Sequence, residues 1–419
     1  MKLINFILSS AINLLAFRSF NIILVWAVIT NSEDNSLSLG LVVAIMWIFN
    51  LISLPISGDI LDKYKKRTVL IYSSFISICS SLLFFLNLHL LESSIMITSI
   101  CASILAATNS ITSSSINSVI PFIAKKRQLD KAISLASTFN SLQTIIGVLL
   151  GGSLIAIFGV TISSVIIIFL YALSSLLVMF VYIDEKENES CNDDAFFKRL
   201  SAGFKVLYQI ECERVICYTA MITNFVLTPL LMVVIPFYVV NALHSDAKLL
   251  AVFEATFALG MLLGASVLSR VDFNIHRRIY PVVIGNILMG VGIIGFSLLT
   301  PIVFKAFCLG ISGFGLTSKG VACNSIRAFA VPNSHRARLE SAIFFLCIAT
   351  IPVGSQFFGY IINVTNIDYI DNILFFMGVI IILTSVFPIL SSQTLNILNK
   401  PNFELDQLYK TKYPSVFGG

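Results

Sequence analysis

Long apolar segments alternate with short polar ones along almost the whole chain. An α-helix needs about 20 consecutive, mainly apolar residues to cross the hydrocarbon core of a bilayer. The pattern therefore predicts an all-α membrane protein with twelve transmembrane helices, at residues 5–30, 37–57, 68–91, 94–122, 132–157, 160–182, 215–241, 248–269, 279–299, 302–330, 341–363 and 371–391.

The longest polar interruption divides these segments into six and six. It carries a run of acidic residues and then an amphipathic stretch from Phe196 to Tyr208. The chain after Ser391 is polar, and we expect it to form a short flexible extension. The predicted organisation is an N-terminal six-helix bundle, a cytoplasmic linker, a C-terminal six-helix bundle and a cytoplasmic tail, at residues 1–183, 184–214, 215–391 and 392–419.

A short internal repeat supports two similarly built halves. Leu129-Asp130-Lys131-Ala132-Ile133 recurs as Leu339-Glu340-Ser341-Ala342-Ile343, 210 residues later. Each copy follows a proline, Pro121 or Pro332, and a basic cluster at the predicted cytoplasmic end of a helix that is rich in polar residues. The equivalent position of the two copies favours duplication over coincidence.

Composition and charge fit this topology. Charged residues make up 12% of the chain, against about 25% in soluble domains, and the mean hydropathy is +0.92. Lys and Arg are concentrated in every second connection between the apolar segments. Short cytoplasmic loops carry such an excess of Lys and Arg, so these connections, and with them both termini, are predicted to be cytoplasmic. The net charge of +5 follows from this placement and does not indicate nucleic-acid binding.

The polar decapeptide from Gly58 to Arg67 separates the second and third apolar segments. Its residues fit a loop pattern of Gly-x-x-x-Asp-(Arg/Lys)-x-Gly-(Arg/Lys)-(Arg/Lys), with Lys65 in place of the second glycine; the matching residues are Gly58, Asp62, Lys63, Lys66 and Arg67. The decapeptide resembles the loop after the second helix of major facilitator superfamily (MFS) transporters. Without the second glycine, the loop is similar to that of the macrolide-efflux and enterobactin-exporter branch, which often lacks this glycine.

This resemblance implies a fold of two six-helix bundles in a bacterial inner membrane, in which helices 1, 4, 7 and 10 line a central cavity. It also implies a gate: Asp62 would meet the N-terminus of helix 11, where the helix dipole favours an anion. Lys63 and Arg67 would complete the latch, with Gly58 beginning the turn. The alternative is a plain cytoplasmic turn with no gating role.

Nearly every ionisable residue falls at a loop or a helix end; the exceptions are Arg18, Glu254 and Lys319. A basic residue at the bilayer centre costs about 2.5–3.5 kcal/mol on insertion scales, so it usually faces a cavity or a partner. The implied cavity would receive Arg18 and Lys319 from opposite halves, and two cations suit an anionic substrate. Alternatively, Arg18 snorkels to an interface and Lys319 pairs with Glu254.

Glu254 is a candidate proton carrier, because desolvation raises a carboxyl pKa towards working pH. It can instead be a counter-ion or face an aqueous vestibule. Uncharged polar residues in the presumed lining helices are further candidates for substrate binding: Asn21, Asn109, Asn117 and Asn224. In helix 4, polar residues recur at helical spacing and form a stripe that can hydrate a pathway or join helices.

The fifth apolar segment contains Gly147-Val148-Leu149-Leu150-Gly151-Gly152. It resembles the Gly-Pro-x-x-Gly-Gly signature of MFS antiporters, with Val148 in place of proline. Small residues let two helices approach closely, so a packing role is expected here. The missing proline removes one indication of export.

Other function classes fit the sequence less well. Gly310-Ile311-Ser312-Gly313 matches the Gly-x-Ser-Gly core of rhomboid proteases, but a serine nucleophile needs an adjacent base. All four His lie at or beyond predicted helix ends. The sequence shows no soluble sensor domain that would support a receptor or scaffold. It also has no phosphate-binding loop, so direct coupling to ATP within this chain is not expected. The eight scattered Cys form no Cys-x-x-Cys pair, so neither a disulfide framework nor a metal site is expected.

The sequence therefore predicts a monomeric secondary transporter rather than an enzyme. Its partners would be the lipid bilayer and a small-molecule substrate, with no nucleic acid, and a proton gradient would replace any cofactor. The expected activity is proton-coupled export of an anionic or amphipathic compound such as a siderophore or drug. The alternative is proton-coupled import of a small anionic solute such as a ferric siderophore.

Overall fold

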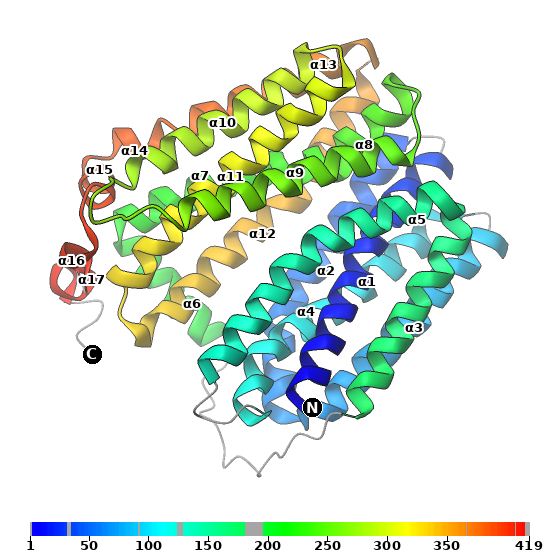
Figure 1. Cartoon of the computed structure of the whole chain (residues 1–419), viewed down its shortest axis with the longest axis horizontal. Coiled ribbons are helices and arrows are strands. Elements are labelled where there is room, and N and C mark those ends of the chain that lie inside the picture. Colours follow the sequence, from blue (N-terminus) through cyan, green and yellow to red (C-terminus); the bar gives the residue numbers. More distant parts are fainter. Residues whose placement is uncertain are drawn as a thin grey trace. The chain divides into compact units, whose positions relative to one another are not determined.

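A computed structural model describes residues 2–31, 35–90, 93–123, 129–180, 196–365, 367–406 and 408–414, and every regular element among them is helical (Figure 1). The main helices are α1 (Lys2–Asn31), α2 (Asn35–Lys63), α3 (Lys66–Leu90), α4 (Ile95–Ile123), α5 (Leu129–Met179), α6 (Phe196–Gln209), α7 (Glu211–Pro229), α9 (Ala247–Leu268), α10 (Ile279–Leu298), α11 (Ile302–Ala330), α12 (Asn333–Val364) and α13 (Ile370–Thr384). This confirms the predicted all-α class.

The continuous element α5 contains two of the predicted helices. Gly159 adopts φ 72° and ψ 175° inside it, which breaks the helical path. A positive φ of this kind is accessible to glycine at little cost because glycine has no Cβ. Predicted helices 5 and 6 therefore run on either side of Gly159, which is consistent with the predicted count of twelve.

The long helices have the length and composition of membrane spans. Among the described residues, eleven helical stretches are apolar enough to cross a bilayer. One of them, from Glu211 to Ala242, combines α7 with short π-helical turns at Leu230–Val234 and Tyr238–Ala242. Proline lacks the N–H of an α-helical hydrogen bond, and Pro229 stands directly before the first of these turns.

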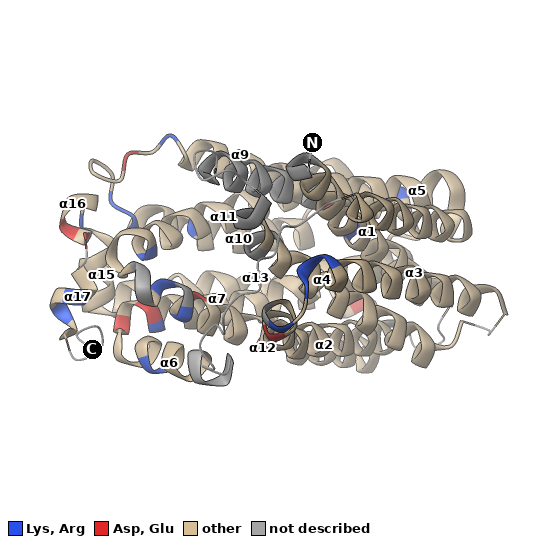
Figure 2. Cartoon of the chain, turned by 90° about the horizontal axis from the view of Figure 1, so that it is seen from below, with Lys and Arg blue, Asp and Glu red and all other residues tan. Residues whose placement is uncertain are grey.

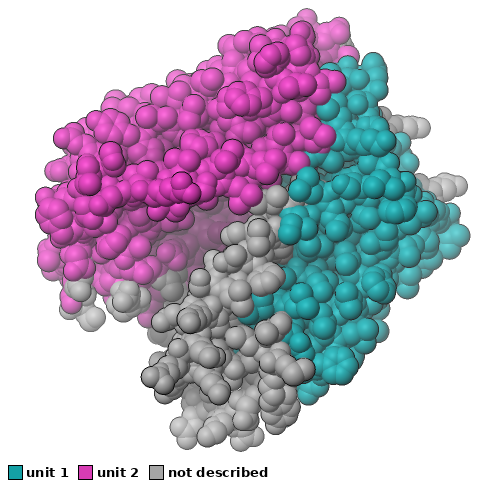
Figure 3. Space-filling view, viewed as in Figure 1, with its two compact units in different colours: residues 1–196, 232–251, 355–364 teal, residues 197–231, 252–354, 365–419 magenta. Residues whose placement is uncertain are grey.

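The chain forms two compact units, coloured teal and magenta in Figure 3. Unit 1 comprises residues 1–196, 232–251 and 355–364, and unit 2 comprises residues 197–231, 252–354 and 365–419. The first part of the predicted linker (184–214), residues 184–195, lies outside the described residues, and its second part forms α6 and the start of α7. The proposed boundaries stay a prediction.

In unit 1, α1 packs along α5 through small residues. A Cβ added to Gly147 would lie 2.6 Å from the Cβ of Arg18, and one added to Gly151 would lie 2.8 Å from the carbonyl oxygen of Ser19. The Ser19 hydroxyl donates to the carbonyl oxygen of Gly147 at 2.8 Å. The packing role predicted for this glycine motif is confirmed.

In unit 2, α11 packs against both α9 and α10, again at glycines. A Cβ on Gly285 of α10 would lie 2.7 Å from the Gly315 carbonyl oxygen of α11. The backbones of Gly260 in α9 and Gly310 in α11 are closer still. These contacts place α11 directly against α9 and against α10 (Figure 1).

The turn between α2 and α3 is shorter than the sequence predicted. Helix α2 continues through Gly58 to Lys63, and α3 begins at Lys66. The expectation that the whole decapeptide forms the turn is therefore wrong. The polar residues after Gly58 continue the helix because they are compatible with it once the chain has left the apolar region.

The chain after Ser391 is folded, so the expectation of a flexible extension is also wrong. It forms α15 (Ser392–Leu398), α16 (Asn402–Leu405) and α17 (Leu408–Lys412), around which charged residues gather in Figure 2. The side chains of Leu398, Leu405 and Tyr409 are fully buried. Their apolar groups join the core of unit 2, which explains why a mostly polar segment is ordered.

Arg278, just before α10, fastens this tail. Its side chain is fully buried, and its guanidinium donates to the Ser325 hydroxyl at 2.8 Å, to the Lys400 carbonyl oxygen at 2.7 Å and to the side chain of Asn402. Its backbone N–H donates to the Leu398 carbonyl oxygen at 3.0 Å. We refer to residues 392–414 as the C-terminal clasp.

We predict that Gly151→Val destabilises the protein, because the added side chain would collide with the backbone of α1. Overpacking of this kind costs about 1–3 kcal/mol. Gly58→Ala is the matched control, since no atom lies within 4 Å of a Cβ placed there. Thermal unfolding of purified protein in detergent measures both, and equal midpoints for the two variants would contradict the close packing of α1 and α5.

Candidate functional site

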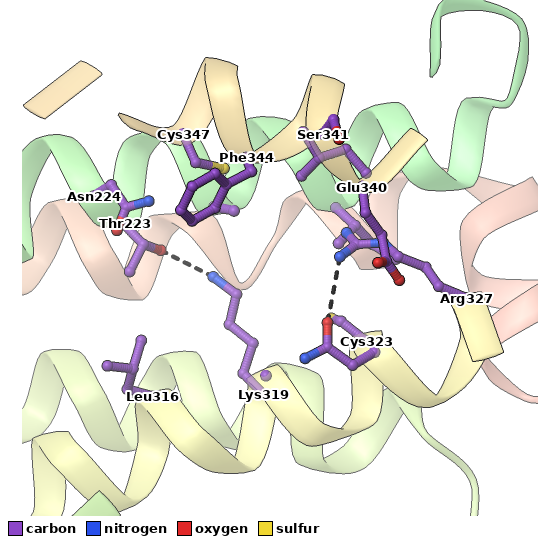
Figure 4. A pocket seen from close by; sticks show the side chains of 15 residues that line it. Thr223, Asn224, Leu316, Lys319, Cys323, Arg327, Glu340, Ser341, Phe344 and Cys347 are labelled. Atoms are coloured by element: carbon purple, nitrogen blue, oxygen red, sulfur yellow. Dashed lines mark hydrogen bonds between the residues drawn. The ribbon is translucent and has the colours of Figure 1, made fainter. Parts of the chain in front are cut away.

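Unit 2 contains a cavity of about 710 Å³ between α7, α11 and α12 (Figure 4). Small-molecule pockets usually measure about 300–1,000 Å³. Helix α7 contributes Thr223 and Asn224, α11 contributes Lys319 and Asn324, and the Phe344 ring of α12 covers another side. The lining thus combines apolar walls with a few polar groups, which is the usual composition of a site for a small amphipathic molecule.

Lys319 is the central cation of this cavity. Its side chain is 5% exposed, and Figure 4 shows it reaching from α11 towards α7. The ammonium donates to the Thr223 hydroxyl at 2.9 Å and to the Thr219 carbonyl oxygen at 3.5 Å. Both acceptors are neutral, and an ammonium has three donors. These contacts therefore hold the ammonium in place but do not neutralise its positive charge.

A second cation on the same face of α11 is compensated. Arg327 lies two helical turns after Lys319, and its Nε donates to Glu213 Oε2 at 2.8 Å. Glu213 is fully buried, and its other oxygen accepts a hydrogen bond from the Tyr409 hydroxyl at 3.2 Å. Burial raises the pKa of Tyr409 well above its ordinary value, so its hydroxyl keeps the proton that it donates.

The difference between the two cations decides the electrostatics of the site. Arg327 and Glu213 cancel, and the pair is tied to the C-terminal clasp through Tyr409. Lys319 is left as the buried charge that lines the cavity, and the exposed Glu340 also borders it. Coulomb attraction is several times stronger in a partly desolvated site than in water. The surroundings of Lys319 therefore favour a negatively charged group of a ligand.

The structure brings two predicted binding residues together, because Lys319 and Asn224 line the same cavity. The predicted alternative of an ion pair between Lys319 and Glu254 is not formed among the described residues. Glu254, on α9, is half-buried and is not part of the cavity lining. Its proposed role in proton coupling stays a prediction.

Arg18 belongs to unit 1 and Lys319 to unit 2, so a joint site stays a prediction. Arg18 is exposed, whereas its neighbours Phe17, Ser19 and Phe20 are buried. In the first half of α1, the accessible residues from Leu8 through positions 11, 12 and 15 to Arg18 share one face. Residues 19–25, which follow Arg18, are buried.

The structure describes the side chains of two of the three asparagines predicted in unit 1. Asn21 is buried and Asn109 half-buried, and the side-chain oxygen of each has no hydrogen-bond partner among the described residues. A buried polar atom without a partner costs about 1–3 kcal/mol, which makes each a reasonable ligand contact. The side chain of Asn117 lies outside the described residues.

The predicted gate residues are only partly described. Gly58 is half-buried within α2, and Lys63 is exposed. Arg67 donates to the carbonyl oxygen of Met179 at 2.7 Å, so it caps the C-terminal end of α5. The side chain of Asp62 lies outside the described residues, and the latch stays a prediction.

Sequence reasoning missed the pair of Glu213 and Arg327. Both residues lie near helix ends, where charged side chains usually reach water, and the predicted helix 7 began two residues after Glu213. A signal was present: Lys319, Cys323 and Arg327 recur every four residues and so share one face of α11. A basic face inside an apolar helix requires an acidic partner or a cavity.

A family model for the Major Facilitator Superfamily matches residues 6–350. The chain belongs to this superfamily. A search of curated protein sequences gave no match. Membership makes this chain a multi-pass membrane protein of a transporter family, as the sequence predicted, whereas the predicted macrolide-efflux or enterobactin-exporter branch is not established by this match.

Solved structures of MFS transporters share the fold of this chain. A D-xylose–proton symporter matches with a TM-score of 0.72 and 14% identity, covering 97% of this chain and 100% of that chain. A nucleoside transporter matches with a TM-score of 0.69 and 12% identity over 95% and 99% of the two chains. A bacterial homologue of the iron transporter ferroportin, in an inward-facing state, gives 0.69 and 13% over 95% and 98%.

We predict that Arg327→Gln strongly destabilises this MFS protein, because it leaves Glu213 as a buried unpaired carboxylate. Breaking one partner of a buried ion pair costs about 3–5 kcal/mol. The double variant Glu213→Gln/Arg327→Gln should recover much of the loss, since no charge then remains buried. Thermal unfolding of the two single variants and the double variant measures the coupling, and additive losses would contradict the pairing.

Proposed function

We propose that this protein is a secondary active transporter that exports a small anionic or zwitterionic, amphipathic compound in exchange for protons. The observation that carries the substrate class is Lys319, a nearly buried ammonium held by the neutral groups of Thr223 and Thr219 at the wall of a 710 Å³ cavity. A carboxylate or similar anion would supply the missing negative charge.

The rest of the cavity supports an amphipathic ligand. Phe344, Leu316 and Ile216 offer apolar surface, and Asn224 offers both a donor and an acceptor. A siderophore or an antibiotic with one acidic group has both properties. Arg18 is the proposed second contact, because its guanidinium can hold a carboxylate in two parallel hydrogen bonds.

The proposed coupling group is Glu254. It lies inside the span Ala247–Leu268, where its carboxylate is costly to keep charged and can take up a proton during the cycle. Export is favoured by the resemblance of the Gly58 loop to exporters of drugs and siderophores. Import of a small anionic solute is the second candidate, since Val148 replaces the proline of the antiporter signature.

Lys319→Gln should reduce transport without unfolding the protein. A hydrogen bond to a charged group contributes about 1.5–3 kcal/mol, so we expect the ratio kcat/KM to fall by about tenfold or more. Lys248→Gln, at an exposed lysine outside the cavity, is the matched control. The assay is uptake into inside-out vesicles with a panel of siderophores and macrolide antibiotics, and right-side-out vesicles test import. Unchanged kinetics in Lys319→Gln would reject the anion site.

Glu254→Gln should uncouple transport from protons. A substrate added to inside-out vesicles with a preset pH gradient should dissipate that gradient in the wild type but not in the variant, while exchange at equal pH continues. Asp246→Asn, at an exposed carboxylate just before α9, is the control. Substrate-dependent proton movement that survives in Glu254→Gln would assign coupling to another group.

A further inference from the structure

Unit 2 carries a continuous apolar groove on the surface of α9, α10 and α11. One cavity of about 310 Å³ and another of about 380 Å³ are each bordered by Leu288 and Phe314, so they adjoin. We call the joined cavities the α9–α11 groove. Its walls are formed by Leu259, Leu263, Ile284, Leu288, Phe307 and Phe314.

The groove results from the glycine contacts that join these helices. Gly260, Gly285 and Gly310 border it, and each lies against the backbone of a neighbouring helix or leaves no side chain to fill the surface. The residues beside them stand out as walls. Leu263 is 61% exposed and Phe307 is 65% exposed, which leaves a depression between large apolar side chains.

Polar side chains inside the groove are already satisfied. The Thr256 hydroxyl donates to carbonyl oxygens of its own helix, at Val252 and Phe253. The Ser318 hydroxyl donates to the Phe314 carbonyl oxygen at 2.8 Å. The groove therefore offers an occupant apolar contact rather than spare hydrogen bonds, and a hydrocarbon chain suits it.

One end of the groove is basic and aromatic. His276, Arg277 and Tyr280 border the cavity there, and all three are exposed. Among the described residues, no hydrogen bond or ion pair holds the Arg277 side chain, whereas the next residue, Arg278, is fully engaged with the C-terminal clasp. Exposed Arg and Tyr at the end of a span mark the headgroup level of a membrane.

The length of the groove corresponds to one leaflet. Its lining on α11 extends from Ala306 to Ser318, and a helix rises 1.5 Å per residue, so these positions are about 18 Å apart. The hydrocarbon core of a bilayer is about 30 Å thick. An acyl chain that starts at the headgroup level near Arg277 would reach the region of the midplane along this groove.

We propose that the α9–α11 groove binds an anionic phospholipid, with its phosphate at Arg277 and one acyl chain along Leu288 and Phe314. The charge of Arg277 selects the headgroup, and the apolar walls select the chain. This site is separate from the cavity around Lys319 and does not depend on the substrate or direction of transport.

Native mass spectrometry of the full-length protein in detergent tests the headgroup contact, with phosphatidylglycerol, phosphatidylcholine and glycerol phosphate as probes. We expect the wild type to retain one phosphatidylglycerol in preference to phosphatidylcholine, and to bind no glycerol phosphate. Arg277→Gln should weaken phosphatidylglycerol binding by about fivefold, as the loss of one basic residue near a membrane surface does. Arg270→Gln, at an exposed arginine of the same loop that does not border the groove, should leave it unchanged.

A second pair of variants tests the chain contact. Leu288→Trp fills the junction of the two cavities and should abolish binding of phosphatidylglycerol, whereas Val291→Trp, at an exposed position of α10 outside the groove, should not. Ile284→Trp, at an exposed wall position, provides the same blockade if Leu288→Trp fails to fold. Equal losses in the two arginine variants, full binding in the blocked variants, or tight binding of glycerol phosphate would each overturn the proposal.

Discussion

Hydrocarbon offers no partner to a charged or polar group, so each such group that enters the membrane must be satisfied within the protein. Unit 2 meets this requirement in three different ways. Lys305 donates to the Phe296 carbonyl oxygen at 2.6 Å and lies over the ring of the same residue. Arg327 pairs with Glu213. Lys319 has neutral acceptors and lines a cavity.

The same requirement distinguishes compensated from uncompensated charges in this chain. A compensated pair such as Arg327 and Glu213 contributes to stability but presents no net charge to a ligand. An ammonium held by a hydroxyl and a carbonyl is oriented without being neutralised. Solved structures of a D-xylose–proton symporter and of a nucleoside transporter share the fold of this chain at 14% and 12% identity, so the fold alone does not indicate the substrate.

The sequence predicted the helices well because a long apolar run has few alternatives in a bilayer. It also predicted that Lys319 and Asn224 share a site, since lining helices follow from the superfamily resemblance. It did not predict the turn at Tyr64 and Lys65 or the order of the C-terminal clasp. The order of the clasp depends on tertiary contacts that have no local signal: Leu398 and Tyr409 are ordered by docking onto Arg278 and Glu213, which lie more than a hundred residues away.

The clasp also sets an order of events during biosynthesis. Tyr409 follows Glu213 by 196 residues, and ribosomes add about 5–20 residues per second. Glu213 therefore emerges some tens of seconds before the phenol that completes its hydrogen bonding, and Arg327 arrives in between. The ion pair of Glu213 and Arg327 can therefore form before the C-terminal clasp is synthesised. A chain that ended before Tyr409 would contain every span but would lack the hydrogen bond that Tyr409 donates to Glu213.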